Sequence, residues 1–395
     1  MPASPFAGLW PLDPGVLHLN HGSFGACPSA VLAFQGALRD ELEREPTDFL
    51  VRRLPARLAA AREALGAFVG ADADDLAFVA NATGGVNAVL RSLELAPGDE
   101  LLTVDHAYGA CRKALDYVAG RAGARVVTAR LPFPVESAGE LVEPVLAAVT
   151  SRTRLALLDH VTSPTALVLP VEPLVAELRA RGVETLVDGA HALGMLPLDL
   201  DRLGAGYYTA NAHKWLCAPR GAAFLHVRRD LQRGIHPLTI SHGFDPAAEG
   251  ARFRAEWDWT GTLDPTAWLA IPECIRYLGG LLPGGWSELM ARNRALCLEA
   301  RRRVGEAIGV EPPCPEGMLG SIASLPLPAP APGAPAAALG HEALMDWTRE
   351  RGVESWFFPW PGPAGKVVRV SAQLYNDAGQ YDRLARLLAE ALGRA

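Results

Sequence analysis

The chain of 395 residues has the composition of a folded globular protein, with 49% hydrophobic residues, 21% charged residues and a formal net charge of -7. This charge and the lack of a basic stripe predict no nucleic-acid partner, and the lack of an apolar run of about 18 residues predicts no membrane span. The amino terminus has no secretory signal pattern, and the six scattered cysteines show no metal-ligand spacing, so we expect a cytoplasmic protein with reduced thiols and no metal.

The first part of the chain alternates helical and strand patterns. Residues 30–69 are predicted to form helices, with Pro46 and Pro55 interrupting the helical pattern. β-rich runs then alternate with stretches whose apolar residues recur at helical intervals. The predicted strands cover residues 76–80, 100–105, 124–130, 154–160, 184–188, 206–211 and 222–227. Strands that alternate with helices predict an α/β fold with a mostly parallel, seven-stranded sheet.

The pattern changes at about residue 265, which indicates a second unit. A helix-rich stretch to residue 308 leads into a Pro/Ala-rich stretch at 328–340, which we expect to be a surface loop. The elements predicted after it are a helix at 341–351, a strand at 366–372 and a helix at 378–393. The predicted parts are an N-terminal segment at 1–30 that contributes to the active site, a large domain at 31–264 and a smaller α+β domain at 265–395.

A glycine-containing turn follows the first predicted strand, in FVANATGGVNAVL at 78–90. A strand that runs through Thr83 and Gly84 into a helix leaves free backbone N–H groups at the positive end of the helix dipole, and such a turn binds phosphate. An ordinary capped helix gives the same pattern. The stretch lacks the lysine of a Walker loop and the full GxGxxG pattern, so a nucleotide-binding protein is disfavoured.

Two later stretches add reactive groups at the same edge of the sheet. Asp188 ends an apolar run, which predicts a carboxylate at the carboxyl edge, where open α/β sheets bind ligands. In ANAHKW, His213 and Lys214 follow another strand, and Lys214 is one of only three lysines in the chain. Taken alone, the aspartate is equally well a turn cap and the lysine a solvated charge. Together, an anion site, a carboxylate and an amine are the groups that hold pyridoxal phosphate.

The chain resembles the fold-type I pyridoxal-phosphate enzymes of the class V aminotransferase family, and within that family the isopenicillin N epimerase-like branch. The resemblance covers nearly the whole chain. It rests on the ordered motifs LHLNHGSFGACP (17–28), FVANATGGVNAVLRSL (78–93), VDHAYGACRKAL (104–115), LDHVTSPTAL (158–167) and NAHKWLCAPRGAAFL (211–225). It implies an enzyme with pyridoxal 5'-phosphate as cofactor, a small amino-acid substrate and a homodimer with active sites at the subunit interface.

The resemblance also implies roles for single residues. Lys214 matches the Schiff-base lysine, and Asp188 matches the carboxylate that keeps the ring nitrogen of the cofactor protonated. His191 stands where relatives use a glutamine to reach the phenolic oxygen. The ring that stacks on the cofactor is either His106 or Tyr108, and both are catalytic candidates. Further positions that match cofactor-binding residues are Thr83, Gly84, Ser163 and His213.

Two further segments complete the implied site. TGTLDP at 260–265 resembles the segment by which a partner subunit donates a threonine, here Thr262, to the cofactor phosphate. VVRVSAQLYN at 367–376 resembles the segment with the arginine that pairs with a substrate carboxylate, here Arg369, and a bidentate guanidinium suits that task. The N-terminal motif adds the candidate substrate-binding residues Asn20, His21 and Gly22.

One departure from the family bears on the reaction. Cysteine desulfurases have a nucleophilic cysteine shortly before the substrate arginine, whereas the matching stretch VESWFFPWPGPAGK at 353–366, an expected loop, has none. A persulfide-forming desulfurase is therefore disfavoured. The branch implies an epimerase-like reaction at the α-carbon of an amino acid or a derived substrate, with Tyr108, His106 or His21 as second acid. The alternatives are a C–S or other β-eliminating lyase and an aminotransferase of secondary metabolism. A non-catalytic binding protein is disfavoured because the lysine and the aspartate are both present.

Overall fold

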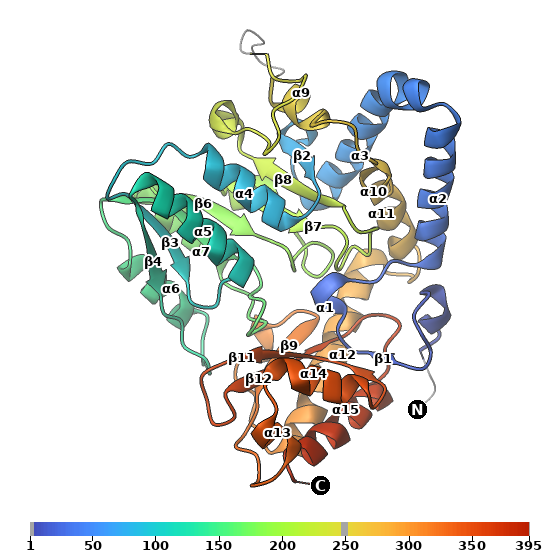
Figure 1. Cartoon of the computed structure of the whole chain (residues 1–395), viewed down its shortest axis with the longest axis vertical. Helices are drawn as coiled ribbons and strands as arrows, with labels where there is room; N and C mark the ends of the chain where they lie inside the picture. Colours follow the sequence, from blue (N-terminus) through green and yellow to red (C-terminus); the bar gives the residue numbers. More distant parts are fainter. Residues whose placement is uncertain (1–3, 246–251, 395) are drawn as a thin grey trace.

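A seven-stranded sheet forms the centre of the computed structural model, which describes residues 4–245 and 252–394 (Figure 1). The strands of this sheet are β2 (Leu76–Val79), β3 (Glu100–Val104), β4 (Arg125–Ala129), β5 (Thr153–Asp159), β6 (Glu184–Asp188), β7 (Tyr207–Asn211) and β8 (Ala223–Val227). Their order across the sheet is β2-β8-β7-β6-β5-β3-β4. All seven predicted strands are therefore confirmed.

Most neighbouring strands of this sheet run parallel. β4, β3, β5, β6 and β7 form parallel pairs, whereas β8 is antiparallel to both β7 and β2. The prediction of a mostly parallel sheet is confirmed. Because parallel strands end at one edge, Asp159 at the end of β5 lies in register with Asp188 at the end of β6. This is the edge at which open α/β sheets bind ligands.

Helices cover both faces of the sheet, because successive strand residues point to opposite sides and both sets are apolar. In β2, Leu76 and Phe78 belong to one core cluster, whereas Ala77 and Val79 belong to the other. Helices that contribute to the first cluster include α2 (Ser29–Arg44), α3 (Leu54–Val69), α6 (Gly139–Ala147), α7 (Val171–Ala180), α8 (Leu200–Leu203), α10 (Thr266–Leu269) and α11 (Ile271–Gly279). The second cluster includes α4 (Ala82–Ser92), α5 (Gly109–Ala122) and α9 (Arg252–Asp258).

The N-terminal segment lies against the C-terminal part of the chain before it enters the large domain. After β1 (Leu17–His18) and α1 (His21–Phe24), the chain enters α2 and α3, which confirm the helices predicted between residues 30 and 69. Pro55 lies in the first turn of α3, where a missing N–H costs nothing. β1 pairs in parallel with β10 (Val353–Glu354), so this segment lies against the C-terminal part of the chain.

The C-terminal part lies below the large sheet in Figure 1 and surrounds a three-stranded antiparallel sheet of order β11-β12-β9. Its elements are α12 (Gly285–Ile308), β9 (Ile322–Pro326), α13 (Pro335–Ala338), α14 (His341–Arg349), β11 (Trp356–Pro359), β12 (Lys366–Ser371) and α15 (Ala378–Ala391). The smaller α+β unit is thus present, and the domain boundaries at residues 30 and 264 stay predictions. The expectation of a loop at 353–366 is wrong, because β11 pairs with β12; α13 likewise interrupts the expected loop at 328–340.

The turn after α1 predicts a strict requirement for glycine at position 25. Gly25 has φ 66° and ψ 173°, a conformation almost restricted to glycine, and a Cβ atom there would lie 1.8 Å from the carbonyl oxygen of His213. We expect Gly25→Ala to lower the free energy of unfolding by more than about 3 kcal/mol, because strain and clash add. Chemical denaturation measures the change.

Gly98→Ala is the matched control for this substitution. Gly98 also has a positive φ, 87°, but a Cβ atom there would meet no atom within 4 Å. We expect it to lose only about 1–2 kcal/mol, the cost of the left-handed conformation. Equal losses in the two variants would show that the N-terminal segment is not packed closely on the turn that contains Lys214.

Candidate active site

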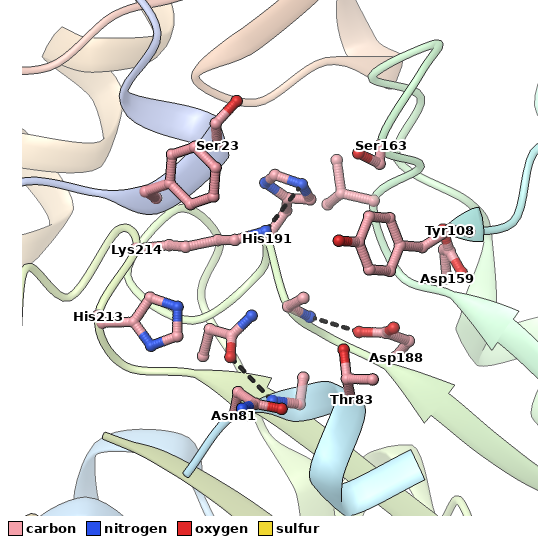
Figure 2. Close-up of a pocket in the computed structure, with 15 residues that line it drawn as sticks. Ser23, Asn81, Thr83, Tyr108, Asp159, Ser163, Asp188, His191, His213 and Lys214 are labelled. Carbon is pink, nitrogen blue, oxygen red and sulfur yellow. Dashed lines mark hydrogen bonds between the residues drawn. The ribbon is translucent and has the colours of Figure 1, made fainter. Parts of the chain in front are cut away.

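A cavity of about 340 Å³ opens at the carboxyl edge of the large sheet, around the ends of β5, β6 and β7 (Figure 2). It is lined by Ser23, Phe24, Asn81, Ala82, Thr83, Tyr108, Asp159, Val161, Ser163, Asp188, Ala190, His191, Asn211, His213 and Lys214. The structure thus brings together, from five separate segments, most of the predicted cofactor residues.

Lys214 lies in the turn after β7 and extends into the cavity (Figure 2). Its Nζ atom lies 3.2 Å from Nε2 of His191. Burial, followed by the positive charge of Arg369, lowers the pKa of the amine to about 8, although Asp188 and Asp159 act in the opposite direction. The amine therefore loses its proton far more readily than an exposed lysine, as attack on a carbonyl carbon requires.

Asp188 is the last residue of β6 and is 4% exposed. Its Oδ1 atom accepts a hydrogen bond from the N–H of Ala190 at 2.9 Å, and Oδ2 accepts one from the thiol of Cys111 at 3.2 Å. Burial raises the pKa of the carboxyl group above its ordinary value, while these hydrogen bonds and Lys214 act against burial. The side chain is fixed in orientation, which suits a group that holds a proton on a heterocyclic nitrogen.

A second buried carboxyl group, Asp159, lines the same cavity and is absent from the prediction. Its Oδ2 atom accepts the N–H of Tyr108 at 3.1 Å, whereas Oδ1 is buried and has no hydrogen-bond partner among residues 4–245 and 252–394. Burial and the neighbouring charge of Asp188 raise its pKa well above the ordinary value. The signal was present in the sequence, because the predicted strand at 154–160 ends in an aspartate as the strand at 184–188 does.

The first turn of α4 offers fewer free N–H groups than the sequence predicts. Oδ1 of Asn81 accepts the N–H of Gly84, and Oδ1 of Asn211 accepts the N–H of Ala82, each at 2.8 Å. In this turn, the described residues leave only the N–H of Thr83 without a protein acceptor. Thr83 lines the cavity and Gly84 does not. Of the two residues expected to bind phosphate, only Thr83 faces the cavity with a free N–H group, next to the helix cap formed by Asn81.

The structure separates the two candidate aromatic rings. Tyr108 lines the cavity and is 43% exposed. His106 is fully buried, with Nδ1 2.9 Å from the hydroxyl of Thr165 and its ring edge-on to Trp360 at a centroid distance of 4.8 Å. Burial raises the pKa of Tyr108, so the phenol keeps its proton. The expectation that His106 faces the cofactor is not supported, because its ring packs behind the cavity wall.

Arg369 lies on β12 and is 2% exposed. Its Nη1 atom donates to the carbonyl and hydroxyl oxygens of Ser163 at 3.0 and 3.2 Å, and Nη2 donates to Ser23 Oγ at 2.8 Å and Asn20 Oδ1 at 3.4 Å. None of these partners is charged, and Nε has no partner in the described part of the chain. Burial lowers the pKa of the guanidinium to about 9. A buried cation with neutral partners is suited to receive an anion.

The predicted substrate-binding residues of the N-terminal segment lie behind the cavity. Nε2 of His21 lies 2.9 Å from the carbonyl oxygen of Lys214, and the N–H of Gly22 donates to Ser371 Oγ at 3.1 Å. Together with Asn20, they hold neighbouring residues and do not line the cavity. The cavity wall contains the next two residues instead, which are Ser23 and Phe24.

Two predicted phosphate-side residues lie in different places. His213 lines the cavity, with Nδ1 3.2 Å from the carbonyl oxygen of Ala222, and burial lowers its pKa to about 4. Thr262 is exposed and does not line the cavity of its own chain. A role for Thr262 in a partner's site stays a prediction. Such a role requires the side chain to be accessible, and Thr262 is exposed.

The chemistry of this cavity fits pyridoxal phosphate. An amine, a fixed carboxyl group, a helix N-terminus and an aromatic ring face one space (Figure 2). In the part of the chain that the structure describes, the buried Oδ1 of Asp159 beside this space has no partner. A metal centre has no such support, since no group of three or more His, Cys, Asp or Glu residues between 4 and 245 or 252 and 394 could hold an ion. No helix in those ranges is long and apolar enough to cross a membrane.

The raised pKa of Asp159 predicts that stability falls as the pH rises. The folded protein binds the proton more tightly than the unfolded chain, so the contribution of this group is complete below its ordinary pKa of 3.8 and declines until the pH passes the folded pKa. We expect Asp159→Asn to raise the free energy of unfolding of the cofactor-free protein by about 1–3 kcal/mol at neutral pH. Denaturation at several pH values should show the gain shrinking toward acid pH.

Asp159→Ala is the comparison variant, because it also removes the acceptor for the N–H of Tyr108. We expect it to gain less than Asp159→Asn at neutral pH. If Asp159→Asn instead lowers the free energy of unfolding at neutral pH, the surrounding groups stabilise the charged carboxylate. Burial of Asp159 would then not destabilise the folded protein.

Comparison with known proteins shows the family to which the chain belongs. Residues 49–384 match the aminotransferase class-V family. The isopenicillin N epimerase of Amycolatopsis lactamdurans is 39% identical over 394 residues, which cover 96% of each chain, and that of Streptomyces clavuligerus is 38% identical over 95% of each. Putative L-cysteine desulfhydrase 1 of Oryza sativa subsp. japonica is 34% identical and covers 80% of this chain and 68% of its own.

Solved structures show the same fold. A mutant of C-DES with glycine covalently linked to its PLP cofactor has a TM-score of 0.79 at 21% identity and covers 98% of this chain and all of its own, 100%. The cysteine desulfurase CsdA from Escherichia coli has a TM-score of 0.77 at 20% identity, with 98% of each chain covered. The predicted fold-type I architecture is therefore confirmed. The chain belongs to the class V aminotransferase family and is a pyridoxal-phosphate-dependent enzyme.

Proposed function

We propose that the enzyme removes and returns the α-proton of an amino-acid substrate, and that the overall reaction is an epimerisation. The observation that carries this proposal is Arg369, a buried cation with only neutral partners beside the cavity of Lys214. A substrate carboxylate would give the guanidinium the counter-ion it lacks. Relatives that are 39% and 38% identical over nearly the whole chain are isopenicillin N epimerases, which supports epimerisation.

The residues around the cavity divide the chemistry. Bound pyridoxal phosphate supplies an electron sink for negative charge at the substrate α-carbon. Lys214 would hold the cofactor, and its amine is the group in the cavity suited to accept the α-proton of the substrate. Asp188 would keep a proton on the ring nitrogen, and Thr83 and His213 would bind on the phosphate side. Tyr108 would supply the aromatic ring that packs against the cofactor.

Epimerisation also requires a proton donor on the face opposite Lys214. Of the three candidates, only Tyr108 lines the cavity; His21 is tied to the carbonyl group of Lys214, and His106 packs behind the wall. Figure 2 shows Lys214 and Tyr108 on opposite sides of the cavity. The raised pKa of the phenol keeps it protonated and ready to donate. We therefore assign the second acid to Tyr108.

A C–S or other β-eliminating lyase is the second candidate, because a putative cysteine desulfhydrase is 34% identical to this chain. An aminotransferase of secondary metabolism uses the same first proton transfer. A persulfide-forming desulfurase stays disfavoured, since residues 353–366 contain no cysteine. The nearest upstream thiol, Cys314, is buried and does not line the cavity.

We further propose that the enzyme acts as a cytoplasmic homodimer. Phe24 is 61% exposed at the cavity wall and Leu263 is 37% exposed beside Thr262. Of the two, only Phe24 lines the cavity, and exposed apolar side chains of this kind fit a surface that a partner covers. A second copy that covers them would bring Thr262 to the phosphate side of the neighbouring site.

Incubation with amino acids in D₂O tests the proposed reaction. The wild-type holoenzyme should incorporate deuterium at the α-carbon and lose chirality, as measured by mass spectrometry and chiral chromatography. We expect Lys214→Ala to abolish exchange. Arg369→Lys should lower kcat/KM by about 10- to 100-fold, because one ammonium replaces a bidentate guanidinium in pairing with the carboxylate.

Lys113→Ala is the matched control, because Lys113 is exposed on α5 and does not line the cavity. Its exchange rate should equal that of the wild type. Release of pyruvate or ammonia would identify a lyase, and accumulation of the pyridoxamine form would identify an aminotransferase. Either result would replace the epimerase proposal.

Hybrid dimers test the proposed role of Thr262. Thr262→Ala should weaken cofactor retention, and Lys214→Ala should abolish covalent attachment. In a hybrid of the two variants, one site has Lys214 from one subunit and Thr262 from the other, so it should regain wild-type retention. Borohydride trapping with peptide mass mapping, after dialysis, measures the fraction retained. If the hybrid retains no more cofactor than Thr262→Ala alone, the threonine does not act across the interface.

A further inference from the structure

The residue after the active-site lysine controls the imidazole beside it. Trp215 is fully buried, and its Nε1–H donates to Nδ1 of His191 at 3.4 Å. An indole nitrogen is only a donor. Nδ1 of His191 must therefore carry a lone pair and no proton.

The second ring nitrogen of His191 then has a defined role. Burial, followed by the charges of Lys214 and Arg369, lowers the pKa of His191 well below its ordinary value, so the ring is neutral. A neutral imidazole has one proton, and with Nδ1 as acceptor that proton is on Nε2. Nε2 lies 3.2 Å from Nζ of Lys214. An N–H that points at an amine requires the amine to offer its lone pair, and only the uncharged amine has one.

We infer that Trp215 is a positioning residue that fixes the tautomer of His191, so that the imidazole donates to Lys214 and stabilises the amine in its uncharged, nucleophilic form. The inference rests on the proposed function only in taking Lys214 as the residue that captures the cofactor. After capture, the same N–H still faces the cavity and offers a donor to an acceptor atom of the bound cofactor.

The opposite tautomer would bring two donors into contact. With the proton on Nδ1, the N–H groups of Trp215 and His191 would face each other, and Nε2 would accept from a charged Lys214. Both donors are buried, and a buried donor without an acceptor is costly. The indole N–H is therefore coupled to the charge of Lys214 through two successive hydrogen bonds, one from Trp215 to His191 and one from His191 to Lys214.

Other charged and titratable groups act on the same pair and set the background for this effect. Those that act on the amine of Lys214 are Arg369, Asp188, Asp159 and Cys111. Those that act on His191, besides the lysine, are Arg369 and His21. His21 packs against the indole ring at a centroid distance of 4.9 Å, so replacement of Trp215 by phenylalanine removes the hydrogen bond to His191 and part of this packing. The charged groups around the lysine and the imidazole stay in place.

Nuclear magnetic resonance of the cofactor-free full chain tests the tautomer directly. In protein with ¹⁵N-labelled histidine, His191 should show a protonated Nε2 and an unprotonated Nδ1 across the neutral pH range, with the signals assigned by their loss in His191→Gln. A proton on Nδ1 in the wild type would overturn the inference. This measurement needs no cofactor and no variant at Trp215.

Cofactor capture tests the consequence for Lys214. The second-order rate constant for capture of pyridoxal phosphate by the cofactor-free protein should rise with pH around the amine pKa of about 8. In Trp215→Phe the ring is free to accept from the ammonium, so the midpoint should rise by about one pH unit and the rate at neutral pH should fall about tenfold. An unchanged midpoint in a folded Trp215→Phe variant would overturn the inference.

Two comparisons isolate the indole N–H. Trp286→Phe also loses a hydrogen bond, from Nε1 to the carbonyl oxygen of Ile275 at 2.9 Å, but outside the cavity, and should leave the midpoint unchanged. In a His191→Phe background, Trp215→Phe should have no effect on the midpoint, because the side chain between the indole and the lysine then has no nitrogen to accept or donate a hydrogen bond. If Trp215 has only a structural role, Trp215→Phe should shift the pH midpoint of capture equally in the wild-type protein and in the variant at His191. If the wild type captures no cofactor, the proposed function fails while the resonance result stands by itself.

Discussion

Burial of four ionisable groups at one edge of the sheet is the constraint on which this site depends. Arg369, Asp159 and Asp188 are 2%, 3% and 4% exposed, and Lys214 reaches into the same cavity. Removing a charge from water costs several kcal/mol unless opposite charges and hydrogen bonds compensate it. Here compensation is incomplete, because Oδ1 of Asp159 and Nε of Arg369 have no partners among the described residues. A ligand with complementary groups therefore stabilises the folded protein as it binds.

Three distant parts of the chain must meet for this arrangement to exist. Arg369 belongs to the C-terminal sheet, and its guanidinium is held by Ser163 from the turn after β5 and by Asn20 and Ser23 from the N-terminal segment. That segment in turn pairs with β10 and approaches the turn of Lys214 so closely at Gly25 that no side chain fits. The positions of the lysine and the arginine are thus coupled through a short stretch of chain, which is itself anchored in the core by Leu19 and Cys27.

The sequence predicts those features that local periodicity and strand ends determine. The seven strands, and with them Asp188 and Lys214 at one edge, follow from apolar runs that end in polar residues. β11 escapes prediction because its short run lies among prolines and tryptophans, and its pairing with β12 defines it as a strand. Asp159 could have been predicted in the same way as Asp188, because it also lies at the end of an apolar strand.

Other features depend on contacts that no local pattern encodes. The choice between His106 and Tyr108 is set by the path of the turn after β3, which directs one ring into the cavity and the other against Trp360. The number of free N–H groups at α4 depends on Asn211, which is distant in sequence but adjacent in space. The fold determines where the site lies, and long-range side-chain hydrogen bonds of this kind determine which polar groups in it are free to bind a ligand.

The charges of the site also link substrate binding to proton transfer. Burial, Cys111 and Asp188 raise the pKa of Tyr108, whereas the charge of Arg369 lowers it. A substrate carboxylate that neutralises the guanidinium removes the only opposing influence, so the phenol holds its proton more firmly once substrate is bound. Under the proposed function, the order of the two proton transfers follows from the chemistry, because the α-carbon loses a proton to Lys214 before it accepts one from Tyr108. Epimerisation requires in addition that the second proton arrive from the face opposite Lys214.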